Sequence, residues 1–179
     1  MTPVNELEEI RFPIGRLMID PDITESKRRL WIAQIAALPA KLRAAVDGLS
    51  EAQLNQRYRP EGWTARQVVH HLADEHINGF TYFKMAITED EPVIKTYNEP
   101  RWAETEDAAA APIELSLNLL AALHARWVVL LDSLDEKGFA RGYIHRRGRI
   151  SIDDGIQLYA WHSLHHTAHI TGLREREGW

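Results

Sequence analysis

The chain has 179 residues, and its 21 basic and 26 acidic residues give a formal net charge of −5. With 45% hydrophobic and 26% charged residues it has the composition of one globular domain over residues 1–179, which excludes a disordered chain. The negative balance excludes a nucleic-acid binder that works by broad phosphate neutralisation, and the absence of cysteine excludes disulfides, thiolate metal sites and a cysteine nucleophile.

Residues 1–20 are predicted to form an extended N-terminal arm, with a break at residues 13–15, where proline and glycine stand close together. The first twelve residues carry three glutamates and no apolar core, so they do not form a signal peptide. We therefore expect a soluble intracellular protein.

A helix is predicted over about residues 23–49, because apolar residues recur there at helical spacing. Pro39 should kink or divide this helix, since proline lacks the backbone donor and clashes with the preceding turn. Ser50 and Gln53 then have the spacing of a capping box, which predicts a short helical turn.

Thr64 and Gln67 repeat that spacing and predict a long helix from Thr64 to about Thr88. The next two dozen residues, 89–112, show no sustained period. A segment of this length within a domain is either a functional lid or binding segment, or a connector held across the fold by its aromatic residues.

Pro112 suits the first position of a helix that runs to about Asp135. Its longest apolar run, residues 115–125, is too short to cross a bilayer, which argues against a membrane protein. Residues 141–152 predict a small β-hairpin. Asp153 or Asp154 can cap a last helix that Gly178 ends. Four principal helices with mostly short connections predict an all-α four-helix bundle with a small hairpin.

The nine histidines are the most informative feature of the composition, and four of them lie in residues 162–169 of the last helix. At about 100° per residue, His166 lies about 40° from His162, His169 about −20° and His165 about −60°. Residues four apart share a helix face, and their imidazoles can converge on one metal ion. His162 and His166 share the apolar face of this helix, so we favour them as metal ligands, with His169 as a supporting partner or substrate contact.

A third ligand must come from another element, and His70 and His71 in the second long helix are the candidates. Periodicity alone does not choose between these two. His76 is five positions from His71 and cannot easily ligate the same ion. The zinc-protease motifs His-Glu-x-x-His and His-x-x-Glu-His are absent, so they indicate no general base.

Other interpretations of the histidines remain. The cluster could instead sense pH, because histidine titrates near neutrality. His76, His124 and His145 taken singly are typical of surface or hydrogen-bonded core residues. Asp74 and Glu75 could orient a ligand or serve as a base, although carboxylates on a helix are more often solvated.

Two segments resemble the YfiT group of the DinB-like proteins: residues 62–74, GWTARQVVHHLAD, and residues 159–170, YAWHSLHHTAHI. The similarity extends to residues 12–15 and 123–127, so it covers nearly the whole chain. It implies an up-down-down-up four-helix bundle and a cytoplasmic homodimer that holds one divalent metal, zinc or nickel, by three histidines. The matching positions are His71, directly before Leu-Ala, together with His162 and His166.

The resemblance implies a metal-dependent hydrolase acting on a small-molecule substrate. By their positions on the two helices, His169, Asp74 or Glu75 could support catalysis. A site with three imidazoles and an open position is typical of catalytic zinc. One alternative is an S-transferase that places a low-molecular-weight thiol, of the bacillithiol type, on the metal. A further alternative is a metal-binding protein without catalytic activity.

Overall fold

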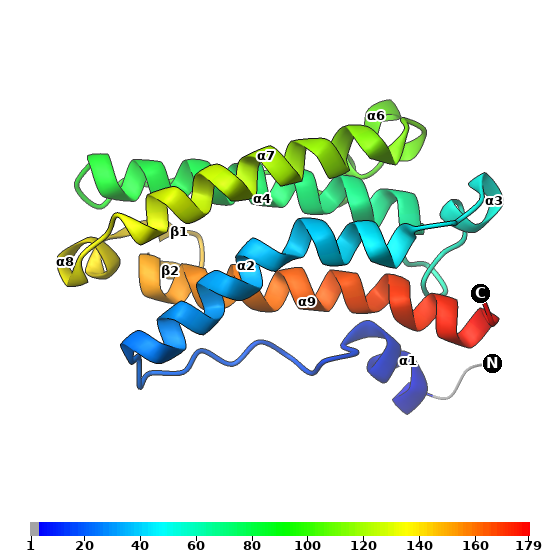
Figure 1. Cartoon of the computed structure of the whole chain (residues 1–179), viewed down its shortest axis with the longest axis horizontal. Coiled ribbons are helices and arrows are strands. Elements are labelled where there is room, and N and C mark those ends of the chain that lie inside the picture. Colours follow the sequence, from blue (N-terminus) through cyan, green and yellow to red (C-terminus); the bar gives the residue numbers. More distant parts are fainter. Residues whose placement is uncertain (1–3) are drawn as a thin grey trace.

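Four long helices lie side by side in the computed structural model, which describes residues 4–179 (Figure 1). They are α2 (Glu25–Val46), α4 (Ala65–Thr88), α7 (Ile113–Asp132) and α9 (Ile152–Glu177). Helices α2 and α9 run in one direction along the bundle and α4 and α7 in the other, which gives the expected up-down-down-up order. Each helix packs on two others, because α2 contacts α7 and α9, and α4 contacts the same pair.

The N-terminal segment differs from the expected extended arm, because α1 (Val4–Arg11) is helical. Glu6 in its first turn and Arg11 in its last turn complement the helix dipole, and Ile10 packs against the core. The extended conformation is confirmed only beyond this helix, and residues 1–3 lie outside the described part of the chain.

Capping boxes start three helices. Ser50 caps α3 (Glu51–Leu54), and Thr64 caps α4, both with the predicted glutamine partner. At α9 the predicted cap is wrong by two or three residues. Ser151 is the N-cap, and Asp154 is its partner at the third helical position, where its carboxylate accepts from the Ser151 backbone N–H.

Pro39 does not divide α2, which continues to Val46 and changes direction partway along the bundle (Figure 1). A proline inside a helix removes one backbone hydrogen bond without breaking the remainder when packing holds both halves. At the end of α9, Gly178 adopts the left-handed conformation with φ 75°, as its position predicts.

The segment 89–112 has the character of a connector with two short helices, α5 (Glu99–Trp102) and α6 (Glu106–Ala109). Its aromatic rings Tyr97 and Trp102 pack at 4.3 Å, and the Gln67 side chain donates to the Ala103 carbonyl at 2.7 Å. The segment is thus held against α4.

A short helix and the predicted hairpin join α7 to α9. The helix is α8 (Glu136–Ala140), and the hairpin consists of β1 (Gly142–His145) and β2 (Gly148–Ser151), paired antiparallel. Two residues, 146–147, form the turn between the strands, at the predicted place.

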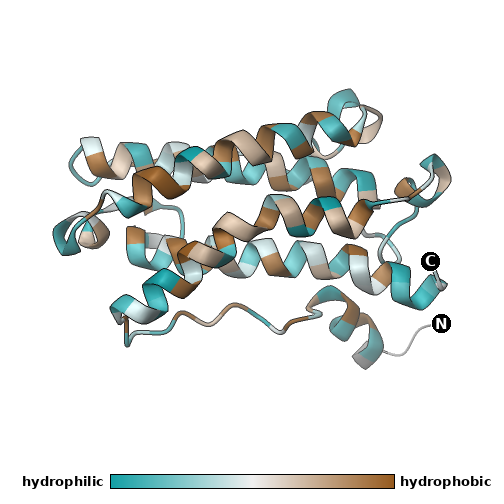
Figure 2. Cartoon of the chain, in the orientation of Figure 1, coloured by the Kyte–Doolittle hydropathy of each residue, from teal (hydrophilic) through white to brown (hydrophobic). Residues whose placement is uncertain are grey.

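Helix α7 is the most hydrophobic of the four long helices, whereas α9 is mostly polar or intermediate along its length (Figure 2). Helix α7 is long and apolar enough to cross a membrane by length and composition, but it packs on α2 and α4 as a bundle helix. The polar character of α9 comes partly from histidines that are buried in the bundle, where a polar atom without a partner is costly.

Candidate metal centre

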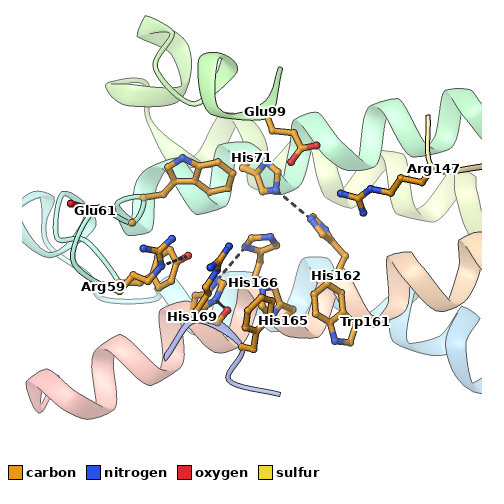
Figure 3. A pocket seen from close by; sticks show the side chains of 15 residues that line it. Arg59, Glu61, His71, Glu99, Arg147, Trp161, His162, His165, His166 and His169 are labelled. Atoms are coloured by element: carbon orange, nitrogen blue, oxygen red, sulfur yellow. Dashed lines mark hydrogen bonds between the residues drawn. The ribbon is translucent and has the colours of Figure 1, made fainter. Parts of the chain in front are cut away.

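Three histidines from two helices meet near the middle of the bundle. His71 projects from α4 and faces His162 and His166 on α9 (Figure 3). Nε2 of His71 lies 3.3 Å from Nε2 of His162, and one nitrogen from each of the three rings lies within 4.8 Å of the others. We call these residues the three-histidine site.

The geometry and chemistry of the three-histidine site fit a divalent metal. Two nitrogens that bind one tetrahedral ion at about 2.05 Å are about 3.3 Å apart, which matches the separation of His71 and His162. Burial lowers the pKa of His162 to about 3 and holds the pKa of His71 and His166 well below the ordinary value. Neutral rings keep the lone pairs that a metal requires.

His70 points to another part of the molecule than His71. Its Nδ1 lies 2.7 Å from the Ser116 hydroxyl and its Nε2 3.1 Å from the Ala111 carbonyl, so both ring nitrogens are used at the start of α7. The structure therefore separates two histidines that periodicity leaves equivalent, and only His71 faces α9.

His169 contacts His166 at the edge of the three-histidine site. Its Nε2 lies 3.1 Å from the Arg11 carbonyl, and a carbonyl can only accept, so Nε2 carries the proton. The Nδ1 atom of His169 is then an acceptor, 3.3 Å from Nδ1 of His166. This hydrogen bond leaves Nε2 as the free acceptor of His166.

His165 belongs to a second possible group of ligands, with His166 and His169. The hydrogen bond just described uses Nδ1 of both His166 and His169, so this group offers fewer free lone pairs than the three-histidine site. His165 stacks on Trp161 at 4.3 Å, and within residues 4–179 its buried Nδ1 has no hydrogen-bond partner.

His76 and His124 are completely buried, with 0% and 1% exposure, and lie behind His162 on the side away from the cavity. Their burial and hydrogen bonding agree with the core interpretation, but they contact one another and His162, which single-residue reasoning misses. His145 lies on the hairpin and is half-buried. Its Nδ1 accepts from the Arg147 backbone.

A cavity of about 410 Å³ opens onto all three histidines of the site. The loop before α4 supplies two aromatic walls: Trp63 packs at 4.4 Å from His71, and Tyr58 stacks at 3.9 Å on His169. Glu99 from α5 and Arg147 from the hairpin turn extend toward the histidines from the opposite side (Figure 3). The cavity therefore has apolar walls and both signs of charge.

A smaller cavity of about 180 Å³ adjoins His162 and contains Glu75. The Glu75 carboxylate accepts from the hydroxyls of Tyr97 at 2.7 Å and Tyr159 at 3.4 Å. Burial raises the pKa of Glu75, and the two phenol donors partly offset that effect. Asp74 is also partly buried. Burial, together with the nearby negative charge of Asp107, raises the pKa of Asp74 to about 6.

Known proteins similar to this chain support a metal centre. The DinB superfamily model matches residues 34–170. "Putative metal-dependent hydrolase YfiT" of Bacillus subtilis is 42% identical over 100% of this chain and 99% of its own length. "Putative metal-dependent hydrolase GK0616" of Geobacillus kaustophilus is 46% identical, over 97% of this chain and 98% of its own.

A solved structure of YfiT from Bacillus subtilis superimposes with a TM-score of 0.93, over 96% of this chain and 99% of that one. It is described as a probable metal-dependent hydrolase with an unusual four-helix bundle topology. That description agrees with the helix order of the present chain.

Proposed function

The chain belongs to the DinB superfamily, and from this premise we propose that it is a hydrolase of small molecules that uses one divalent metal. His71, His162 and His166 would hold the metal, zinc or nickel. The observation that carries the proposal is the convergence of their ring nitrogens within 4.8 Å. The names of the relatives, each of which reads "Putative metal-dependent hydrolase", support it.

Three neutral imidazoles with an open position are the donor set of catalytic zinc sites. A metal held in this way would supply Lewis acidity and would lower the pKa of a water molecule to about 7. The protein supplies the neutral state of the rings, because burial prevents their protonation. His169 orients His166 through the hydrogen bond between their Nδ1 atoms.

We assign proton transfer to Glu75 rather than Asp74. Glu75 lines the cavity that adjoins His162, which places its carboxylate beside the three-histidine site, and burial raises its pKa. The hydroxyls of Tyr97 and Tyr159 hold each of its oxygens in place. Asp74 lies on the neighbouring face of α4, nearer to Asp107.

The substrate would occupy the cavity between the three-histidine site and the aromatic walls. A volume of about 410 Å³ suits a small molecule. His165 would contact the substrate, because it lines this cavity with a buried Nδ1 that has no partner within residues 4–179. Binding there would satisfy that nitrogen.

The test is turnover by protein that has been stripped with a chelator and reloaded with zinc or nickel. We expect hydrolysis within a panel of esters, amides and lactones, dependent on metal and lost in His71→Ala. A parallel panel would combine a low-molecular-weight thiol with electrophiles. Thiol conjugates without hydrolysis would show an S-transferase, and metal binding without turnover would show a non-catalytic protein; either result contradicts the proposal.

A further inference from the structure

A line of hydrogen bonds runs from the three-histidine site into the core, and each of the four long helices contributes one member. Nδ1 of His162 on α9 lies 3.2 Å from Nε2 of His76 on α4. Nδ1 of His76 lies 3.0 Å from Nε2 of His124 on α7. Nδ1 of His124 lies 2.6 Å from the carbonyl oxygen of Ile35 on α2. We call this line the histidine relay.

The last acceptor of the histidine relay exists because of a proline. In an α-helix the carbonyl of residue 35 accepts from the N–H of residue 39, four positions later. Residue 39 is Pro39, which has no N–H. The Ile35 carbonyl therefore lacks its helical donor, and the ring of His124 donates to it instead.

The carbonyl fixes the position of every proton in the relay. A carbonyl oxygen can only accept, so Nδ1 of His124 carries a proton and its Nε2 is an acceptor. The N–H at Nδ1 of His76 must then donate to that acceptor, which leaves Nε2 of His76 to accept from Nδ1–H of His162. Each neutral ring has one N–H and one lone pair, so the order cannot be reversed locally.

We propose that His76 and His124 are positioning residues that hold His162 in the tautomer with its proton on Nδ1, so that Nε2 is free to bind the metal. This inference rests on the proposed metal site for its purpose, but the proton order itself does not depend on a metal. Pro39 takes part by exposing the carbonyl that ends the relay.

The relay orients His162 but does not carry protons away from it. It ends on a backbone carbonyl inside the bundle, and His76 and His124 are only 0% and 1% exposed. A proton that entered the relay would find neither solvent nor an ionisable group at its far end. The rings of His76 and His124 have centroids 4.9 Å apart and planes that differ by 21°, which fits a hydrogen bond between their ring nitrogens.

The first test is the ¹⁵N spectrum of the imidazoles in the metal-free protein at neutral pH, which distinguishes the two neutral tautomers. We expect the proton on Nδ1 in His162, His76 and His124. A proton on Nε2 in His124 or His162 would overturn the proposal. This measurement needs only the wild-type chain and no metal.

The second test changes the relay at its far end. His124→Phe keeps a ring in place but removes both nitrogens, so Nδ1–H of His76 loses its acceptor. We expect His76 to move its proton to Nε2 and to drive the proton of His162 to Nε2 as well. Zinc affinity, measured by competition with a chromophoric chelator, should fall by about 10- to 100-fold. His124→Gln offers an amide oxygen to His76 and should restore most of the affinity.

One control and one further variant separate the relay from a general effect on packing. His70→Phe removes another buried, hydrogen-bonded histidine of α4 and should leave the His162 tautomer unchanged. Pro39→Ala introduces a backbone N–H that competes with His124 for the Ile35 carbonyl, and alanine also favours the helix. This substitution should therefore shift the NMR signal of the Nδ1 proton of His124.

An unchanged His162 tautomer and zinc affinity in His124→Phe would overturn the proposal, as would equal losses in His70→Phe. If the wild type bound neither zinc nor nickel while its tautomers followed the predicted order, the relay would stand and the proposed metal-dependent function would fail.

Discussion

Gly79 lies buried in the middle of α4, directly beneath the ring of Tyr159. A Cβ atom at this position would lie 2.2 Å from Cζ and 2.4 Å from the hydroxyl oxygen of Tyr159. Tyr159 is only 1% exposed, and its ring is confined by Trp127 at 5.0 Å and His76 at 5.2 Å. The substitution Gly79→Ala therefore creates a clash that the tyrosine cannot easily relieve.

Stabilising and destabilising effects together set the change in the free energy of unfolding. Alanine favours a helix over glycine by about 0.5–1 kcal/mol. Overpacking a full core costs about 1–3 kcal/mol, and displacing Tyr159 would also weaken its hydrogen bond to Glu75, at about 1 kcal/mol. We expect Gly79→Ala to lower the free energy of unfolding by about 1–3 kcal/mol, and the Tm by about 3–10 °C for a chain of this size.

Gly172 on α9 provides the matched control. A Cβ there would meet only the flexible end of Arg176, at 3.3 Å, so Gly172→Ala should raise the free energy of unfolding by about 0.5–1 kcal/mol. Urea unfolding of the two metal-free variants would measure the change in the free energy of unfolding of each, relative to the wild type. Equal or greater stability of Gly79→Ala relative to the wild type would refute the close packing of Tyr159 on α4.

Further predictions concern charge and assembly. The pKa of Asp74 is raised to about 6, against 3.8 in the unfolded chain, so its ionised form destabilises the fold above pH 6. Asp74→Asn should raise the Tm at pH 7.5, with a gain that disappears toward pH 4; an equal gain at both pH values would contradict this. Arg28 is buried between Asp153, at 2.8 Å, and Glu136, at 2.9 Å. Arg28→Met should lower the free energy of unfolding by about 3 kcal/mol, because it leaves the Asp153 carboxylate without its partner. Adding Asp153→Asn should recover part of that loss in urea unfolding, and no recovery would contradict the pairing. We also expect a homodimer that covers apolar residues exposed on α7, so light scattering should give twice the 20.5 kDa chain mass, and a monomer would contradict it. Those residues are Leu115, Leu119 and Val129.

Local sequence signals predicted most of the fold because the interactions behind them are local. The capping boxes at Ser50 and Thr64 join residues three positions apart, so the sequence alone identifies them. The sequence of residues 4–11 does not by itself predict a helix, because the stability of α1 depends on contacts with α9, which lies far away in the sequence. The sequence does not single out Ser151 as the cap of α9, because Asp153 and Asp154 are equally good cap residues.

The candidate site was only partly accessible to sequence reasoning. The spacing of His162 and His166 predicted a shared face, but the choice of His71 over His70 came from the family resemblance, because both are buried on α4. The histidine relay could not be predicted, since its members come from four helices. Pro39 is the one feature of the sequence that indicates the end of the relay. Because proline has no N–H, the carbonyl of Ile35, four residues earlier, has no helical donor, and a buried carbonyl must find another one.

The central claim is that His71, His162 and His166 together bind one divalent metal, and metal stoichiometry tests it most directly. Elemental analysis of untagged protein, followed by titration with zinc and nickel, would compare the wild type with the alanine variant of each histidine. His145→Ala, on the hairpin, is the control. We predict one equivalent of metal per chain in the wild type and control, and its loss in each of the three variants. A wild type that binds neither metal, or variants that retain a full equivalent, would contradict the account.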